Sequence, residues 1–405
     1  MQLEPLAYHV AVADYLQQAE PELWRWFRSD AFGKSSKAET DKDLLRTAIR
    51  LERATDKSGP NERRYALADK ARDALGLSAP ITLFQMQDPN GPPNAFLVHA
   101  PGEILIAFSG RILELLVTDA ELLDLFGHEI SHYKLFAEAD GRYHTADRLL
   151  LWLIQRDTCP PEFAETWRRT RLTTEIYCDR GGLIACSDRD ATIRGLVKAI
   201  ADFKDADAAS YLRQAHELNE KLLADGNAAT RGTTHPELHV RVLAIAHAEK
   251  PAADFDALLR PLIAGKIELG GLDLIDQQQL RELARAVLDR VLGGTAGGKG
   301  AASEEAVAHA RQMFPDYQPP DPRTLVGPAR PLPKATANFA ASAVDFLAYL
   351  LLDLGAMDGT GSRAAMAVAA EAADELGLGP RFREIARMEL KGRRALLAGL
   401  TSRAA

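Results

Sequence analysis

Residues 118–136 read TDAELLDLFGHEISHYKLF, and this stretch predicts the helix around which the rest of the chain is arranged. Thr118 is a favourable N-cap residue, and Glu121, three residues later, completes a capping box. Apolar side chains recur at helical spacing through the same stretch, at Leu122, Leu125, Phe126, Ile130 and Tyr133. We therefore expect one amphipathic helix that is largely buried.

The pentapeptide HEISH occupies residues 128–132 of this helix. His128 and His132 are four residues apart, so their imidazoles project from one helical face and can bind the same metal ion. Glu129 follows the first of them, where its carboxylate can take a proton from water without itself binding the metal. The alternative is a surface helix with two solvated histidines. The apolar neighbours favour a buried helix, in which unpaired imidazoles are costly.

A further helix is predicted over residues 166–186, TWRRTRLTTEIYCDRGGLIAC. Glu175 and Asp179 are four residues apart and so share one face. Two histidines need a third protein ligand around an open zinc position, and Glu175 fits that role. Asp179, one turn further on, can accept a hydrogen bond from a ligand imidazole and fix its tautomer. An exposed acidic pair on a helix remains the alternative interpretation.

Residues 226–241, GNAATRGTTHPELHVR, supply the remaining polar groups that we assign to the site. His235 precedes a proline that suits the start of a helix. We expect His235 and Arg241 to face the metal as catalytic side chains, because such groups stabilise the oxyanion formed when water adds to a peptide carbonyl. His239 lies four residues after His235, but we interpret it as structural or solvated rather than as part of a second metal site.

The hydrophobic period changes to that of strands at ITLFQM, residues 81–86, and EILIAF, residues 103–108. Turn residues between these runs surround the triplet Asn94, Ala95, Phe96. We expect a small sheet packed on the HEISH helix, with the triplet binding substrate at the sheet edge. An extended peptide can be bound there as an added strand.

Composition restricts the classes of partner. The chain has 405 residues, 46% hydrophobic and 26% charged, with a formal net charge of −8 and no basic stripe, which argues against nucleic acid as a partner. We see no signal peptide at the N-terminus, and no apolar run long enough to span a bilayer. Three cysteines in a long chain argue against a disulfide framework. We therefore expect a cytoplasmic protein.

The chain is predicted to be mostly helical, in the α+β class, and to have two domains. The expected parts are N-terminal helices at 1–78, one of them at about 41–54, a catalytic core at 79–250, a helical extension at 251–292, a Gly/Ala- and Pro-rich linker at 293–336, and a helical accessory domain at 337–405. The first three parts form one domain, residues 1–292.

Several of these motifs together resemble the HtpX and CAAX-prenyl-protease family of zinc metallopeptidases over about residues 65–245. The resemblance is carried by NAF at 94–96, SG at 109–110, TDAEL at 118–122, HEISH at 128–132, EIYCD at 175–179 and THPELHVR at 234–241. It implies a zincin-type domain with one Zn²⁺ per chain. By the resemblance, zinc would be bound by His128, His132 and Glu175, with Glu129 as general base, Asp179 behind a ligand, and His235 and Arg241 lining the cleft.

The sequence also departs from that family. Cys178 replaces the alanine that usually precedes the aspartate, and Arg171 lies four residues before Glu175 where the family commonly has an arginine three before. A redox role for Cys178 is a minor alternative to an inert buried thiol. The transmembrane helices of the membrane-embedded members are absent. The chain therefore looks like a soluble branch, and prenylated substrates are not expected.

Residues 350–378 faintly resemble TerB-like helical domains, in which a DG turn between helices recurs. Asp353 and Asp358 flank such a turn. We interpret it as an exposed turn in a helical bundle rather than as a calcium site, because the alternating carboxylates of an EF-hand loop are missing.

The function expected from these residues is a zinc-dependent endopeptidase that acts on peptides or proteins. Two alternatives stay open. The protein could capture peptides without hydrolysing them, although an intact Glu129 argues against this. It could also be a regulated peptidase in which the C-terminal helical domain binds a protein partner and controls or targets the catalytic domain.

Overall fold

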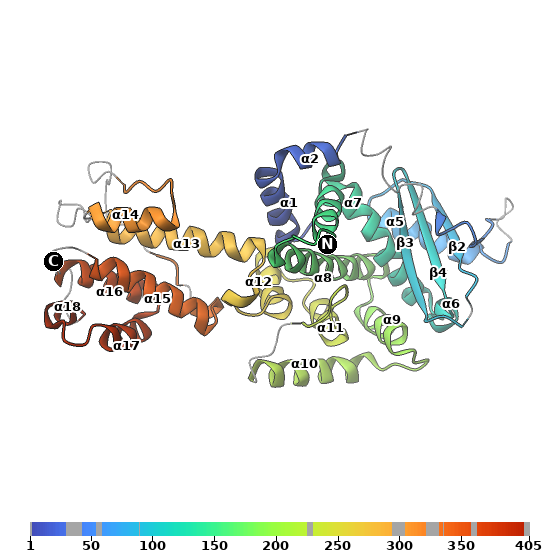
Figure 1. Cartoon of the computed structure of the whole chain (residues 1–405). Coiled ribbons are helices and arrows are strands. Elements are labelled where there is room, and N and C mark those ends of the chain that lie inside the picture. The colour runs from blue at the N-terminus through green and yellow to red at the C-terminus, as the bar shows by residue number, and fades with distance from the viewer. Residues whose placement is uncertain are drawn as a thin grey trace. The chain divides into compact units, whose positions relative to one another are not determined.

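The computed structural model describes residues 2–29, 43–53, 59–88, 90–224, 230–293, 304–320, 332–334, 336–357 and 363–400. The described residues are mostly helical and form two compact units, Met1–Gly265 and Lys266–Ala405 (Figure 1). Among these residues, no helix has both the length and the apolar character needed to cross a membrane.

The described part of the first unit combines helices with a small sheet. Its helices are α1 (Ala7–Ala19), α2 (Pro21–Phe27), α5 (Glu62–Ala74), α6 (Ile112–Leu115), α7 (Asp119–Ile154), α8 (Pro161–Cys186), α9 (Arg189–Ala201), α10 (Ala208–Ala224), α11 (Leu238–Ala246) and α12 (Ala252–Ile263). Its strands are β1 (Ile49–Arg50), β2 (Ile81–Gln85), β3 (Asn94–Ala100) and β4 (Glu103–Ser109).

The sheet has the strand order β1-β2-β4-β3. Strands β2 and β4 run parallel, and β3 returns antiparallel to β4 with Asn94 opposite Ser109. The predicted strands at 81–86 and 103–108 are confirmed. The predicted helix at about 41–54 is wrong over its described part, because Ile49 and Arg50 pair with β2 instead. Over the described residues β3 is an edge strand, and it contacts α7.

Helix α7 begins as its sequence predicts. The Thr118 hydroxyl accepts a hydrogen bond from the Glu121 amide at 3.2 Å, and the Glu121 carboxylate accepts one from the Thr118 amide at 3.3 Å. This capping box satisfies amides that the first helical turn leaves without partners. The helix continues beyond the predicted end to Ile154, but its backbone breaks at residues 138–141, where Ala139, Asp140 and Gly141 have positive φ.

Helices α7 and α8 approach each other very closely, and small residues make this possible. A Cβ atom on Gly181 would lie 1.7 Å from the Ser131 hydroxyl oxygen, and one on Gly127 would lie 2.6 Å from the Cβ atom of Ala185. Both glycines therefore have no room for a side chain. The close packing places the HEISH face of α7 directly beside one face of α8.

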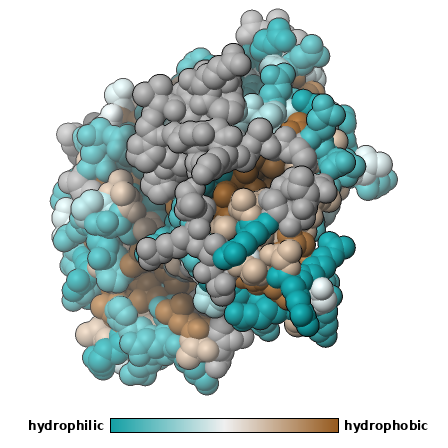
Figure 2. Space-filling model, turned by 90° about the vertical axis from the view of Figure 1, so that its left-hand side faces the viewer, coloured by the Kyte–Doolittle hydropathy of each residue, from teal (hydrophilic) through white to brown (hydrophobic). Residues whose placement is uncertain are grey.

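The second unit is helical and has its own core. Its helices are α13 (Leu274–Leu292), α14 (Glu304–Met313), α15 (Ala341–Ala356), α16 (Arg363–Glu375), α17 (Gly379–Glu389) and α18 (Arg394–Gly399). Figure 2 shows the end of this unit that carries α14, α16 and α18, where apolar side chains gather between hydrophilic ones. The unit thus exposes some apolar surface.

The boundary between the units lies earlier than the predicted one at 292/293. Val287 and Leu288 of α13 are fully buried in the same core cluster as Leu347 of α15 and Met366 of α16. Burial of that apolar helix face fixes α13 in the second unit. The predicted linker includes α14, Asp353 lies on α15, and Asp358 is outside the described residues.

A buried ion pair ties the start of α7 to α9. The Lys198 ammonium lies 2.7 Å from the Glu121 carboxylate, and their side chains are 7% and 1% exposed. Burial alone raises the pKa of Glu121, but hydrogen bonds from Lys198 and from the Thr118 and Val117 amides lower that pKa overall. The folded protein therefore favours the ionised form of Glu121.

We predict that Glu121→Gln destabilises the protein at neutral pH by about 2 kcal/mol, because it removes a charged hydrogen bond and leaves Lys198 buried. A carboxyl whose pKa is depressed on folding stabilises the protein above its unfolded pKa, and this contribution is lost as pH falls through the folded value. The difference between variant and wild type in urea unfolding should therefore shrink below about pH 4.5. A difference that does not change with pH would contradict this account.

Candidate metal centre

Two adjacent helices bring three ligand-type side chains together. His128 and His132 project from one face of α7 with ring centroids 5.2 Å apart. Glu175 of α8 faces both of them, with one carboxylate oxygen 3.6 Å from Nε2 of His128 and the other 3.7 Å from Nε2 of His132. All three side chains are at most 15% exposed. The sequence spacing predicted this set, and the fold brings it to one place.

The separation between each Nε2 atom and its nearer Glu175 oxygen, 3.6 and 3.7 Å, is close to that of neighbouring ligand atoms around zinc. Bonds of about 2.0–2.2 Å in a tetrahedral site put neighbouring ligand atoms about 3.3–3.6 Å apart. Glu175 supplies a carboxylate, because the charges of Arg241 and of the histidines lower its pKa although burial raises it. Burial lowers the pKa of His132 to about 3, so its imidazole is neutral and has a lone pair to offer.

Asp179 fixes the orientation of His128. Its Oδ1 atom lies 3.0 Å from Nδ1 of His128, which leaves Nε2 facing Glu175. Burial alone lowers the pKa of His128, but the hydrogen bond to Asp179 and the neighbouring carboxylates raise it to about 9. The imidazole of His128 is therefore protonated near neutral pH, and metal binding would displace the proton on Nε2. Asp179 is thus placed where it could orient His128 as a metal ligand.

Arg241 borders the cleft, as expected, but its guanidinium is hydrogen-bonded to an acidic residue of α8. Its side chain is 7% exposed and donates two hydrogen bonds to Asp179, at 2.8 and 2.6 Å, and its nearest approach to Glu175 is 3.6 Å. The guanidinium is therefore committed to holding the two acidic residues of α8. The expectation that Arg241 meets a substrate oxyanion does not agree with this geometry.

Glu129 is buried next to the ligand set. Burial raises the pKa of Glu129 to about 7, although the positive charges of His128 and Arg241 lower it. Its carboxylate accepts a hydrogen bond from the backbone amide of Leu97 on β3, which joins the base to the edge strand. A carboxylate with this pKa can both accept and release a proton near neutral pH.

His235 reaches the site from a loop rather than from a helix. Its Nε2 atom lies 3.7 Å from Glu175, and Nδ1 lies 2.9 Å from the Thr234 hydroxyl. The side chain is 62% exposed, much more than any of the other residues around Glu175. His239, by contrast, is buried on α11 and is not among the residues that line the cleft around these side chains.

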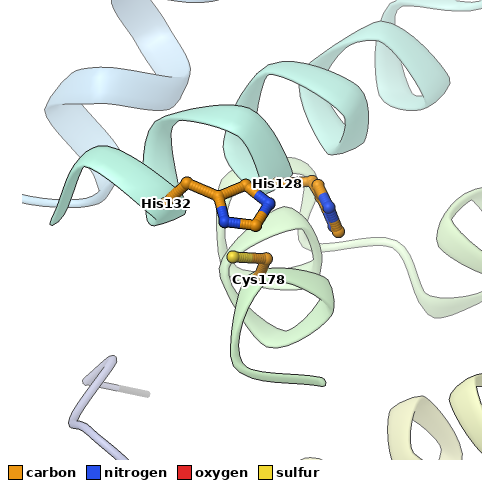
Figure 3. A group of neighbouring side chains, drawn as sticks. All are labelled: His128, His132 and Cys178. Carbon is orange, nitrogen blue, oxygen red and sulfur yellow. The ribbon is translucent and has the colours of Figure 1, made fainter. Parts of the chain in front are cut away.

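Cys178 lies beneath the two imidazoles (Figure 3), and one ligand atom from each of Cys178, His128 and His132 can be chosen so that all three lie within 4.8 Å of one another. Cys178 is fully buried, and burial together with three nearby carboxylates raises its thiol pKa well above the usual value. Glu175, in contrast, is already ionised and faces both Nε2 atoms. Charge state and orientation therefore favour Glu175 over Cys178 as a candidate third ligand.

The ligand set opens into a cleft of about 890 Å³. Strand β3 runs along it, and Asn94, Ala95 and Phe96 all border it. The Asn94 side chain accepts from the Ala95 amide, while Phe96 packs against the cluster of Val98 and Leu105. Strand β3 therefore forms part of the cleft lining.

The two ends of the cleft differ in chemistry. Around α6 and α9 the lining is apolar, with Ile112, Leu116, Leu196, Ala199 and Ile200. Beyond His132 it carries aromatic rings and charges, with His99, Phe136, His144, Asp147, Arg148 and Arg171. Arg171 lies 3.7 Å from Asp147, so the arginine noted as a departure in the sequence lines the cleft one turn before Glu175.

Residues 58–170 match the model of peptidase family M48. The matched segment includes HEISH and strands β2, β3 and β4, but not β1, and it ends before Glu175 and Asp179. No curated protein and no solved structure matches the chain. M48 peptidases are zinc metallopeptidases, so this match supports a peptidase of the metallopeptidase class.

Proposed function

We propose that this protein is a zinc-dependent endopeptidase. The observation that carries the proposal is the position of the Glu175 carboxylate, 3.6 Å from Nε2 of His128 and 3.7 Å from Nε2 of His132, inside a cleft that an edge strand borders. Zinc bound by these residues would polarise a peptide carbonyl and make water a stronger nucleophile near neutral pH. The chemistry of the donor set, two imidazoles and a carboxylate, is that of catalytic zinc sites.

Glu129 acts as the general base of the proposed reaction. It is buried beside the ligands, and its pKa of about 7 suits it to take a proton from the attacking water. The protonated carboxyl then donates that proton to the leaving amine. Its hydrogen bond from the Leu97 amide holds the carboxylate at the strand edge.

The substrate is a polypeptide in extended conformation. Strand β3 offers backbone groups along the cleft, so a peptide can add to the sheet there with little demand on its sequence. His235 stands at the exposed side of Glu175, where its imidazole can donate a hydrogen bond to the oxygen of the carbonyl under attack. Asp179 and Arg241 keep His128 and Glu175 in place during the reaction.

Capture of peptides without hydrolysis is the less favoured function, because a binding protein has no use for a buried carboxyl poised at the metal ligands. Control of the peptidase by the second unit is compatible with this mechanism. The apolar side chains at the surface of that unit (Figure 2) are the observation that favours a protein partner there.

We predict that Glu129→Gln lowers cleavage of fluorescein-labelled denatured casein by at least about 100-fold, because a carboxamide cannot accept the proton. Zinc content, measured by elemental analysis, should stay near that of the wild type. The control is Glu114→Gln, which changes a carboxylate on α6 outside the cleft lining. Full activity in the Glu129 variant would remove this residue from the mechanism.

We predict that Glu175→Ala weakens zinc binding at least about tenfold, whereas Cys178→Ser leaves it within about twofold. The reason is that the carboxylate faces both Nε2 atoms and is ionised, while the thiol is buried and protonated. Competition with a chromophoric chelator measures both affinities. The reverse order of effects would make Cys178 the third ligand.

A further inference from the structure

His235 requires an explanation of how it is held in place. It belongs to the loop at residues 230–237, which has no helix or strand of its own, and its side chain is 62% exposed. A group that stabilises developing charge must be held within about half an ångström of its working position. The contacts that fix this loop therefore bear on the proposed reaction.

Arg168 of α8 holds the loop by its backbone. Its Nη1 atom donates to the carbonyl oxygen of Gly232 at 2.8 Å and, at 3.4 Å, to that of Thr230. Arg168 precedes Glu175 by two helical turns, so both residues project from the same face of α8. One helix thus presents the metal ligand and also the side chain that anchors the loop opposite it.

The guanidinium of Arg168 is itself held rigidly. Glu165 accepts hydrogen bonds from its Nε and Nη2 atoms at 2.7 and 2.8 Å, one on each carboxylate oxygen. This bidentate pair orients Nη1 toward the loop carbonyls. A lysine could not reproduce the arrangement, because its ammonium lacks the planar fork that binds a carboxylate and a carbonyl at once.

The 230–237 loop is compact, so fixing the carbonyl of Gly232 also restricts the position of His235. Glu237 accepts from the Arg231 amide at 2.8 Å and from the Thr230 hydroxyl, and the Thr230 amide donates to the Leu262 carbonyl at 2.7 Å. A Cβ atom on Gly232 would lie 2.0 Å from the carbonyl oxygen of His235. The Arg168 acceptor, Gly232, is therefore packed directly against the backbone of His235.

We propose that Arg168 is a positioning residue, which fixes the 230–237 loop through the carbonyls of Thr230 and Gly232 so that His235 meets the substrate carbonyl oxygen. This inference rests on the proposed function, because it gives His235 its task in peptide hydrolysis. Arg168 itself touches neither the ligand set nor the substrate.

The test is a double-mutant cycle in the full chain with fluorescein-labelled denatured casein as the probe. We expect Arg168→Gln to lower kcat about tenfold with KM within about twofold, and His235→Ala to lower kcat about 100-fold. Combined with His235→Ala, the Arg168 substitution should have no further effect, because it acts through that histidine. If kcat of the double variant falls by the product of the two single-variant factors, the proposal is overturned.

Hydrogen exchange gives a readout that does not depend on activity. In Arg168→Gln the amides of residues 230–237 should exchange at least about tenfold faster, while α8 and the zinc content stay as in the wild type. Gly232→Ala should reproduce the loss of kcat by displacing the loop from within. The matched control is Arg111→Gln, which breaks a comparable bidentate pair with Asp202 outside the site.

The outcomes separate this inference from the proposed function. If the wild type cleaves casein but Arg168→Gln changes neither kcat nor exchange in the loop, the role of Arg168 is overturned and the peptidase stands. If the wild type does not cleave casein, the proposed function fails and the catalytic role of Arg168 with it.

Discussion

The hydrogen-bonded carboxylate of Asp179 is the interaction on which the candidate site depends. This residue of α8 is 2% exposed, and it accepts from His128 of α7 and from Arg241 of α11. Burial alone would raise the pKa of Asp179, but the adjacent Arg241 and His128 lower it to about 2. One charged group therefore joins three helices and sets the tautomer of His128. Such a buried group is stable only because each of its partners is in place.

Helix α8 is the element that organises the site. Arg168, Arg171, Glu175 and Asp179 follow one another along one face at intervals of three or four residues. Arg168 holds the 230–237 loop, and Arg171 lines the cleft. Glu175 faces the two histidines, and Asp179 orients His128. The glycines at the contact with α7 bring this face within reach of HEISH. The sheet contributes the other wall of the cleft, with Glu129 hydrogen-bonded to its edge strand.

Local patterns in the sequence predicted much of this arrangement. The capping box at Thr118, the helical spacing of HEISH and the spacing of Glu175 and Asp179 each depend on a few neighbouring residues, and the structure shows all three as expected. The strands at 81–86 and 103–108 were equally evident from their apolar runs and flanking turn residues.

Features that depend on distant contacts could not be predicted in the same way. Arg168 binds backbone carbonyls more than 60 residues away, and a carbonyl acceptor has no sequence signature. The sequence led us to expect Arg241 at the substrate oxyanion, but in the structure its guanidinium is hydrogen-bonded to Asp179. Ala139 and Asp140 adopt positive φ in the break of α7, where only Gly141 hints at a turn. The place of α13 in the second unit follows from a core that forms only when the helices assemble.

The central claim is that two imidazoles and the Glu175 carboxylate bind a single zinc ion. X-ray absorption at the zinc edge of the purified, zinc-loaded protein tests it most directly. We predict a first shell of nitrogen and oxygen atoms at about 2.0–2.2 Å, with the multiple-scattering pattern of two imidazoles and no sulfur. A zinc–sulfur distance of about 2.3 Å would make Cys178 a ligand and contradict the account.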